Sequence, residues 1–201
     1  LSAEELSRQL DSGAQVVDTR SRYAWAGGHI AGSIAIPLDT GLSTWAGWTV
    51  AYDTPIVLIA DPAHLESVVR MLVRIGLDEV VGYLPDVTPW VEAGGTLTQT
   101  AQISAESLAE SLDGYTVLDV RGEGEFEDGH IDGAVNVHAG RLPNQREDIP
   151  SDRPIAVHCQ SGYRSTIASS LLERMGFTNV HNLTGGYEAW ESASQKELVS
   201  G

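Results

Sequence analysis

The stretch Ile155-Ala-Val-His-Cys-Gln-Ser-Gly-Tyr-Arg-Ser165 decides how this chain folds. It opens with a short apolar run typical of a buried strand and continues through small residues, and a helix is predicted from Arg164. A strand followed by a crossover helix is the unit of a parallel sheet, and ligands bind at the carboxyl ends of such strands. We therefore predict a functional site at Cys159.

A related pattern occurs about 100 residues earlier in the chain, which indicates a duplicated domain. Val17-Asp-Thr-Arg20 matches Leu118-Asp-Val-Arg121, and Gly28-His-Ile-Ala-Gly32 matches Gly129-His-Ile-Asp-Gly133. The Gly/Thr-rich stretch Gly94–Thr100 is typical of a linker. We predict two domains, residues 1–97 and 98–201.

Each half alternates strand-like and helix-like patterns. Strands are predicted in the second half at Thr116–Val120, Ala134–Val137, Ile155–His158 and Val180–Leu183. Helices are predicted there at Ser104–Leu112, Arg164–Met175 and Tyr187–Ser192, and Ser2-Ala-Glu-Glu5 opens a helix of the first half as a capping box. Continuous apolar strands joined by helices predict an α/β fold in each half, with a mainly parallel central sheet flanked by helices on both faces.

Composition excludes several classes of function. The formal net charge is −16, from 28 acidic and 12 basic residues, and such a surface repels nucleic acid and anionic lipid. No apolar run approaches the roughly 18 residues of a membrane span. The chain starts at Leu1 without a methionine, which indicates an excised fragment that a further domain can precede.

Cys159 is the only cysteine, so neither an internal disulfide nor a multi-cysteine metal site can form. A lone free thiol fits a reducing compartment, and we predict a cytoplasmic protein. Taken alone, a single cysteine is more often an inert core residue. Its position favours reactivity. The conformational freedom of Gly162 would let the following loop curl so that its amide groups point at the sulfur, and these amides together with the guanidinium of Arg164 would stabilise a thiolate.

The loop Cys159-Gln-Ser-Gly-Tyr-Arg-Ser165 resembles the active-site loop of the rhodanese family. Three further stretches are similar to family motifs: Leu118-Asp-Val-Arg121 with Glu125-Phe, Gly129-His-Ile-Asp-Gly-Ala-Val-Asn136, and Leu183-Thr-Gly-Gly-Tyr-Glu-Ala-Trp190. The resemblance covers the second half and, in degraded form, the first. It implies two tandem rhodanese-like domains and transfer of sulfane sulfur through a cysteine persulfide.

The resemblance also implies roles for individual residues. Cys159 would take sulfur from thiosulfate or a small persulfide and pass it to a thiol or cyanide, without metal or organic cofactor. The persulfide would be held by amide groups of residues Gln160, Ser161, Gly162, Tyr163, Arg164 and Ser165. Arg164 would orient an anionic donor, Ser165 would add a hydroxyl, and Gln160 and Tyr163 would line the rim.

Three other interpretations stay open from the sequence. A cysteine phosphatase resembles this loop but has one more residue between cysteine and arginine than Gln160–Tyr163 provide. A sulfur-relay or regulatory module would belong to a larger persulfide-processing protein with a metallo-β-lactamase fold, whose upstream domain or protein acceptor would be the partner. A non-catalytic binding domain would keep Cys159 without using it.

The first half lacks a nucleophile, because the position of Cys159 falls on Ala60 or Asp61. This half is therefore predicted to be non-catalytic, with roles in packing, shaping a cleft or docking a protein. Its aromatic residues are interpreted as buried interface anchors in preference to a docking surface: Trp25, Trp45, Trp48 and Tyr52.

Other polar residues are assigned structural roles. His29 and His130 occupy equivalent positions, which favours a shared hydrogen bond, and His138 and His181 lack metal-ligand spacing. The other predictions are that His158 points away from the thiol by strand alternation, that Arg121 pairs with Glu125, and that Gly185-Gly186 turns the last helix toward the cysteine loop.

Overall fold

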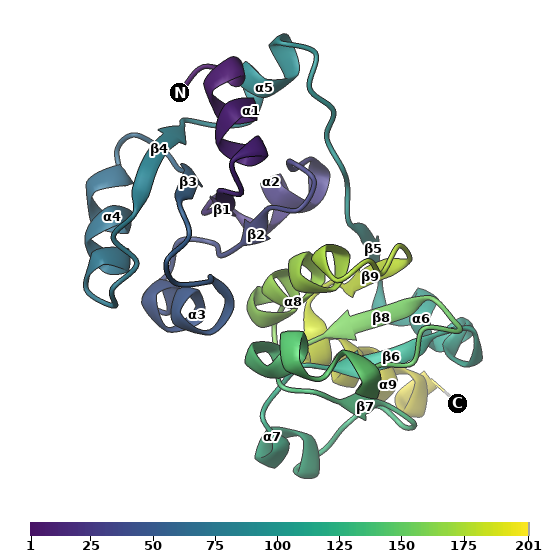
Figure 1. The fold of residues 1–201 in the computed structure, drawn as a ribbon. Coiled ribbons are helices and arrows are strands. Elements are labelled where there is room, and N and C mark those ends of the chain that lie inside the picture. The colour runs from purple at the N-terminus through teal and green to yellow at the C-terminus, as the bar shows by residue number, and fades with distance from the viewer. Residues whose placement is uncertain (201) are drawn as a thin grey trace. The chain divides into compact units, whose positions relative to one another are not determined.

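The computed structural model describes residues 1–200, with side chains described through Gln195. It divides into two compact units, Leu1–Gln99 and Thr100 onward, which are described separately. Each unit is built on a parallel sheet (Figure 1). The predicted α/β class with two tandem domains of this type is confirmed.

The first unit holds a sheet with strand order β2-β1-β3-β4. All its neighbouring strands pair in parallel. Its elements are α1 (Ala3–Asp11), β1 (Gln15–Asp18), α2 (Arg22–Gly27), β2 (Ile34–Ala35), α3 (Leu42–Thr49), β3 (Ile56–Ile59), α4 (Leu65–Val73), β4 (Val80–Leu84) and α5 (Thr88–Glu92). The capping box predicted at Ser2 is present, since its side chain and that of Glu5 each accept the other's backbone amide.

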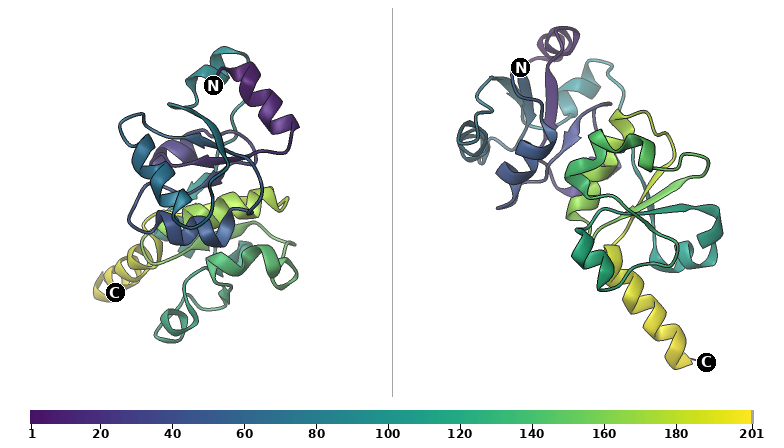
Figure 2. Two further views of the ribbon diagram at one scale, coloured as in Figure 1. Left: turned by 60° about the vertical axis from the view of Figure 1, so that its left-hand side comes forward. Right: turned by 60° about the horizontal axis from the view of Figure 1, so that its bottom comes forward.

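The second unit holds a parallel sheet with strand order β5-β9-β8-β6-β7. Its elements are β5 (Ala101–Ile103), α6 (Ala105–Glu110), η1 (Leu112–Gly114), β6 (Thr116–Asp119), α7 (Glu123–Glu127), β7 (Val135–Asn136), η2 (Ala139–Asn144), η3 (Arg146–Asp148), β8 (Ile155–His158), α8 (Tyr163–Arg174), β9 (Val180–Leu183) and α9 (Gly186–Ser200). Figure 2 shows α9 as the long helix that ends the chain.

The four predicted strands of this unit are confirmed, with differences of one residue at the ends of two of them. β5 was not predicted. It has three residues, two of them exposed at the sheet edge, and so carries little hydrophobic signal.

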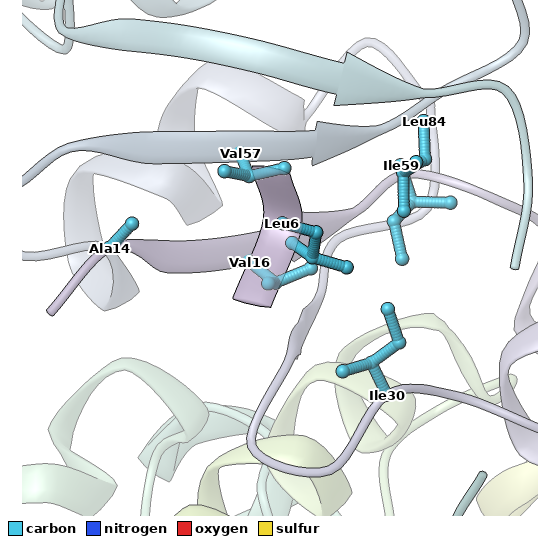
Figure 3. Close-up of a cluster of buried hydrophobic side chains, with 7 residues drawn as sticks. All are labelled: Leu6, Ala14, Val16, Ile30, Val57, Ile59 and Leu84. Atoms are coloured by element: carbon cyan, nitrogen blue, oxygen red, sulfur yellow. The ribbon is translucent and has the colours of Figure 1, made fainter. Parts of the chain in front are cut away.

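Each sheet buries one face against the first and the last helix of its unit. In the first unit, Leu6 of α1 packs on Val16, Val57 and Ile59 (Figure 3). In the second, residues of α6 and α9 pack on Ile103, Val117, Ala156 and Leu183. The continuous burial of β1, β3, β6 and β8 reflects coverage of both faces.

Strand register identifies the residue of the first unit that corresponds to Cys159. Asp18 is opposite Ile59 in the first sheet, and Asp119 is opposite His158 in the second. The next residue after β3 is Ala60, fully buried. Ala60, and not Asp61, therefore occupies the position of Cys159, and alanine carries no nucleophile.

The paired histidines share a structural role, as predicted. His29 Nδ1 lies 3.0 Å from the carbonyl oxygen of Trp25, and the two rings stack. His130 Nδ1 lies 2.9 Å from the carbonyl oxygen of Phe126 in the same arrangement. Each histidine fastens the turn after a short helix.

The aromatic residues interpreted as buried interface anchors differ in exposure: Trp25 is buried, as expected, whereas two others are not. Trp25 is 1% exposed. Trp48 and Tyr52 are 51% and 48% exposed, because they lie at the end of α3 and in the following turn. These two side chains are surface residues.

Candidate active site around Cys159

Cys159 lies directly after β8, in a loop that leads into α8. Its side chain is 1% exposed, yet Sγ has polar neighbours. The backbone amide of Gly162 donates to Sγ at 3.2 Å, and the thiol lies 3.7 Å from Ser165 Oγ. An amide at a helix N-terminus stabilises negative charge on the atom it faces.

Gly162 makes this geometry possible. Its φ of +111° is a conformation that residues with a Cβ rarely adopt. The residue is the N-cap of the 12-residue α8, and its carbonyl accepts hydrogen bonds from the backbone and hydroxyl of Thr166. The curl and the helix start are therefore one structural unit, as the small residues of this stretch predict.

Arg164 is bound by a carboxylate from α7. Its Nη1 and Nη2 donate to Glu125 at 2.5 and 2.7 Å. Glu125 raises the pKa of Arg164, and the nearby Cys159 adds to the rise. In turn, hydrogen bonds from Arg164 lower the pKa of Glu125 to about 2. The guanidinium next to the sulfur is thus permanently charged and already paired.

The predicted pair of Arg121 and Glu125 is wrong. Arg121 binds Asp119 through several hydrogen bonds, the shortest 2.6 Å, because both leave β6 at its carboxyl end. It also donates to the carbonyl of Gly129 at 2.7 Å and to Gln160 Oε1 at 3.2 Å. Arg121 therefore ties the loop after β8 to the end of β6.

The turn at Gly185-Gly186 brings the last helix to the cysteine loop, as predicted. Both glycines have positive φ, 78° and 63°. The amide of Tyr187 donates to the Cys159 carbonyl at 2.8 Å, and that of Glu188 donates to the Gln160 carbonyl at 3.1 Å. The N-terminus of α9 thus holds the loop by its backbone.

His158 lies fully buried beside the site. Nδ1 is 3.3 Å from the Cys159 carbonyl oxygen, and Nε2 is 3.7 Å from Asp119 Oδ2. Burial lowers the pKa of His158, with Asp119 opposing the shift, so the ring is neutral at pH 7. Among the described residues Nε2 has no hydrogen-bond partner.

The remaining predicted residues lie in the same loop. Ser161 is exposed, and Gln160 and Tyr163 are half-buried. A pocket of about 220 Å³ lies against this loop, with walls formed by Arg121, Glu125, Asp128, Gly129, Gln160, Tyr187 and Glu191.

Several residues of this region were not singled out from the sequence as site residues, Glu125 and Tyr187 among them. For Glu125 the repeat offered a clue that the residue pairs with the loop arginine. The matching residue in the first half is Ala24, and that half also lacks the loop arginine.

The first unit has a larger pocket, about 620 Å³, at its own strand ends. Its walls are formed by Thr19, Arg20, Ser21, Pro37, Leu38, Asp61, Pro62, His64, Pro85 and Asp86. Here the loop after β3 contains Asp61 and Pro62, and α4 starts only at Leu65. This unit therefore has a cavity at its strand ends and lacks the thiol.

The described residues hold no group of three or more histidine, cysteine or acidic side chains arranged to bind a metal ion. Within the same part of the chain, no helix has the length and apolar character needed to cross a membrane.

Comparison with known proteins identifies the family. The model of the rhodanese-like domain matches residues 2–93 and again residues 104–193. This chain therefore belongs to the rhodanese-like family, with two such domains.

Named relatives include sulfurtransferases. The chain is 37% identical to the thiosulfate sulfurtransferase GlpE of Shewanella oneidensis, over 46% of this chain and 93% of that protein. It is 39% identical to YqhL of Bacillus subtilis over 37% of this chain, and spans 59% of YqhL. It is 28% identical to the probable adenylyltransferase/sulfurtransferase MoeZ of Mycobacterium tuberculosis, over 85% of this chain and 44% of MoeZ. A solved rhodanese-related protein of Thermoplasma volcanium is 32% identical over 46% of this chain and 92% of its own, with a TM-score of 0.44.

Proposed function

We propose that this protein is a sulfurtransferase in which Cys159 accepts a sulfane sulfur atom and passes it to a thiol or to cyanide. The observation that carries the proposal is the amide of Gly162 donating to Cys159 Sγ at 3.2 Å. A persulfide needs a thiolate to form and a cradle of hydrogen-bond donors to hold its terminal sulfur. Such donors are expected from residues 160–165, which comprise the loop and the first turn of α8.

The reaction has two half-reactions. In the first, the Cys159 thiolate attacks the outer sulfur of the donor, a new S–S bond forms, and the donor's own S–S bond breaks with its electron pair on the leaving group. In the second, an acceptor thiolate or cyanide attacks the outer sulfur and releases the Cys159 thiolate. Ping-pong kinetics follow from this order.

Roles of the neighbours follow from their contacts. Ser165 Oγ, 3.7 Å from Sγ, would hold the thiol or persulfide in place. Arg164 would act mainly by its field on Cys159, since its guanidinium is bound by Glu125. This modifies the expectation that Arg164 orients an anionic donor. A lone free thiol fits a reducing compartment, and we propose the cytoplasm.

Intact-mass measurement tests the proposal. After incubation with thiosulfate or an alkyl persulfide, we expect the full chain to gain the mass of one sulfur atom and to lose it on addition of cyanide. Because Cys159 is the only cysteine, the gain is assigned without ambiguity. The Cys159→Ser variant is the control and should gain nothing. A wild-type mass that stays constant with every sulfane donor would exclude transfer chemistry.

A further inference from the structure

The wall of the pocket beside the cysteine loop holds more acidic than basic side chains. It lies against Gln160, the residue after Cys159, and against Tyr187, whose amide holds the Cys159 carbonyl. A donor approaching this side of the loop meets the charges of the pocket wall.

Both arginines near the pocket are already matched by carboxylates. Arg121, 3% exposed, is bound to Asp119 at 2.6 Å, and its guanidinium lies 4.1 Å from the ring centre of Tyr187. Arg164 is bound to Glu125 at 2.5 Å. Away from the cysteine sulfur, each cation therefore contributes little net attraction for an anion, because the negative charge of its partner offsets its field at a distance.

Further carboxylates surround these pairs. Asp128 and Glu191 stand in the pocket wall, and Glu188 Oε1 lies 3.4 Å from Gln160 Nε2. All three are exposed. The charged groups of this region are thus two arginines, Arg121 and Arg164, and five carboxylates, Asp119, Glu125, Asp128, Glu188 and Glu191. Asp132 is a sixth carboxylate whose charge acts on Tyr187. Burial raises the pKa of Tyr187, and the negative charge of Glu191 raises it further.

A third arginine does not alter this balance in the pocket. Arg141, on η2, lies close enough to His138 for its charge to lower that residue's pKa, after the larger effect of burial. It is not part of the pocket wall.

We infer that the donor is a small persulfide bearing a positively charged ammonium group, in preference to thiosulfate or to a persulfide bearing a carboxylate. This rests on the proposed function of Cys159 and specifies its substrate class. The paired arginines and the additional carboxylates favour a cation beside the loop and repel an anion.

The transfer step balances without an added oxidant. The Cys159 thiolate attacks the outer sulfur of R–S–SH, forming Cys159–S–SH, while the S–S bond of the donor breaks and its electron pair leaves on RS⁻. The leaving thiolate takes a proton from water. The ammonium group of R takes no part in the bond changes and acts only through its charge.

The test compares two donors of nearly equal size, cysteamine persulfide and mercaptopropionate persulfide, with thiosulfate as a third. The rate at which each loads sulfur on Cys159 of the full chain is followed by intact mass at low and high salt. We expect the ammonium donor to load about tenfold faster than the carboxylate donor at low salt, and the ratio to fall toward one at about 1 M salt.

Charge-neutral variants locate the effect. Asp128→Asn together with Glu191→Gln should reduce the donor ratio by about threefold or more, whereas Glu110→Gln, an exposed carboxylate of α6 outside the pocket, should leave it unchanged. Equal or faster loading from thiosulfate or the carboxylate donor would overturn the inference while the proposed function stood. An unchanged ratio in the double variant would also overturn it. Failure of every donor to load would instead overturn the proposed function itself.

Discussion

Gly186 stands where the last helix meets the cysteine loop. A Cβ at this position would lie 2.5 Å from the Cys159 carbonyl oxygen, and the φ of +63° adds strain for any residue with a side chain. We expect Gly186→Ala to destabilise the protein by on the order of 3 kcal/mol and to slow sulfur loading at least about tenfold.

The matched control is Gly133→Ala. Gly133 has a similar φ of +77°, but nothing lies within 4 Å of a Cβ built there. Backbone strain in Gly133→Ala should lower the free energy of unfolding by only about 1 kcal/mol, and the rate of sulfur loading should equal that of wild type. Urea denaturation and intact mass measure both variants, and equal losses in the two would contradict the view that α9 shapes the loop.

His158 should make stability depend on pH. Burial lowers its folded-state pKa below the ordinary value of 6.5, so the unfolded chain binds a proton that the folded chain does not. Stability should therefore be complete above about pH 7 and decrease as pH falls below that value, with a slope limited to about 1.4 kcal/mol per pH unit.

His158→Ile removes this titration and inserts the residue that the first unit has at the same strand position, Ile59. The comparison is the difference in unfolding free energy between wild type and variant, measured by denaturation over about pH 5 to 7.5. Burial also lowers the pKa values of His138 and His181, but both residues are present in wild type and variant, so their contributions to the pH dependence cancel in that difference. A pH-independent difference would show that His158 does not titrate in this way.

At the scale of elements, the decisive comparison is between the loops after β3 and β8. Both follow a buried strand in equivalent register. The second loop has Gly162 at φ +111° as the N-cap of α8, whereas α4 has His64 at φ −110° as its N-cap. The first loop also has no arginine corresponding to Arg164, and the first unit has no carboxylate to bind one, since Ala24 occupies the position of Glu125. We therefore propose that sulfur transfer needs the whole loop and not only a thiol.

This view predicts that a cysteine alone does not restore function. In the chain carrying Cys159→Ser, the added substitution Ala60→Cys should load sulfur at least about a hundredfold more slowly than wild type, because the first loop provides neither the glycine curl nor the arginine. Intact mass with an alkyl persulfide measures it. Loading near the wild-type rate would show that burial at a strand end suffices.

At the scale of the whole molecule, each unit has its own sheet and core. The second unit buries Ile103, Leu108, Val117, Ile131 and Leu183 in one cluster made of its own residues. We expect residues 100–201 expressed alone to fold and to load sulfur within about twofold of the full chain, and residues 1–99 alone to load none. Circular dichroism and intact mass measure this, and a second unit that is unfolded alone would contradict it.

The repeat made most of the architecture predictable. Matching strands and motifs at a constant offset specify two α/β units, and Ile155–His158 and Val180–Leu183 were located to the residue. The edge strand β5 was missed because three residues with two exposed side chains do not show a strand pattern. The partner of Arg121 was misassigned because helix-like spacing to Glu125 says nothing of the direction in which each side chain leaves the backbone.

The family resemblance, the duplication and the loop in which chemistry is proposed were predictable from the sequence, because they depend on residue types and spacing along the chain. Which charges meet at that loop depends on the tertiary structure. It paired Arg164 with Glu125 and Arg121 with Asp119, and it gathered Asp128, Glu188 and Glu191 beside Gln160. These contacts join α7, α9 and the ends of β6 and β8, and the electrostatic field of a site is set by distances in space that spacing in sequence does not fix.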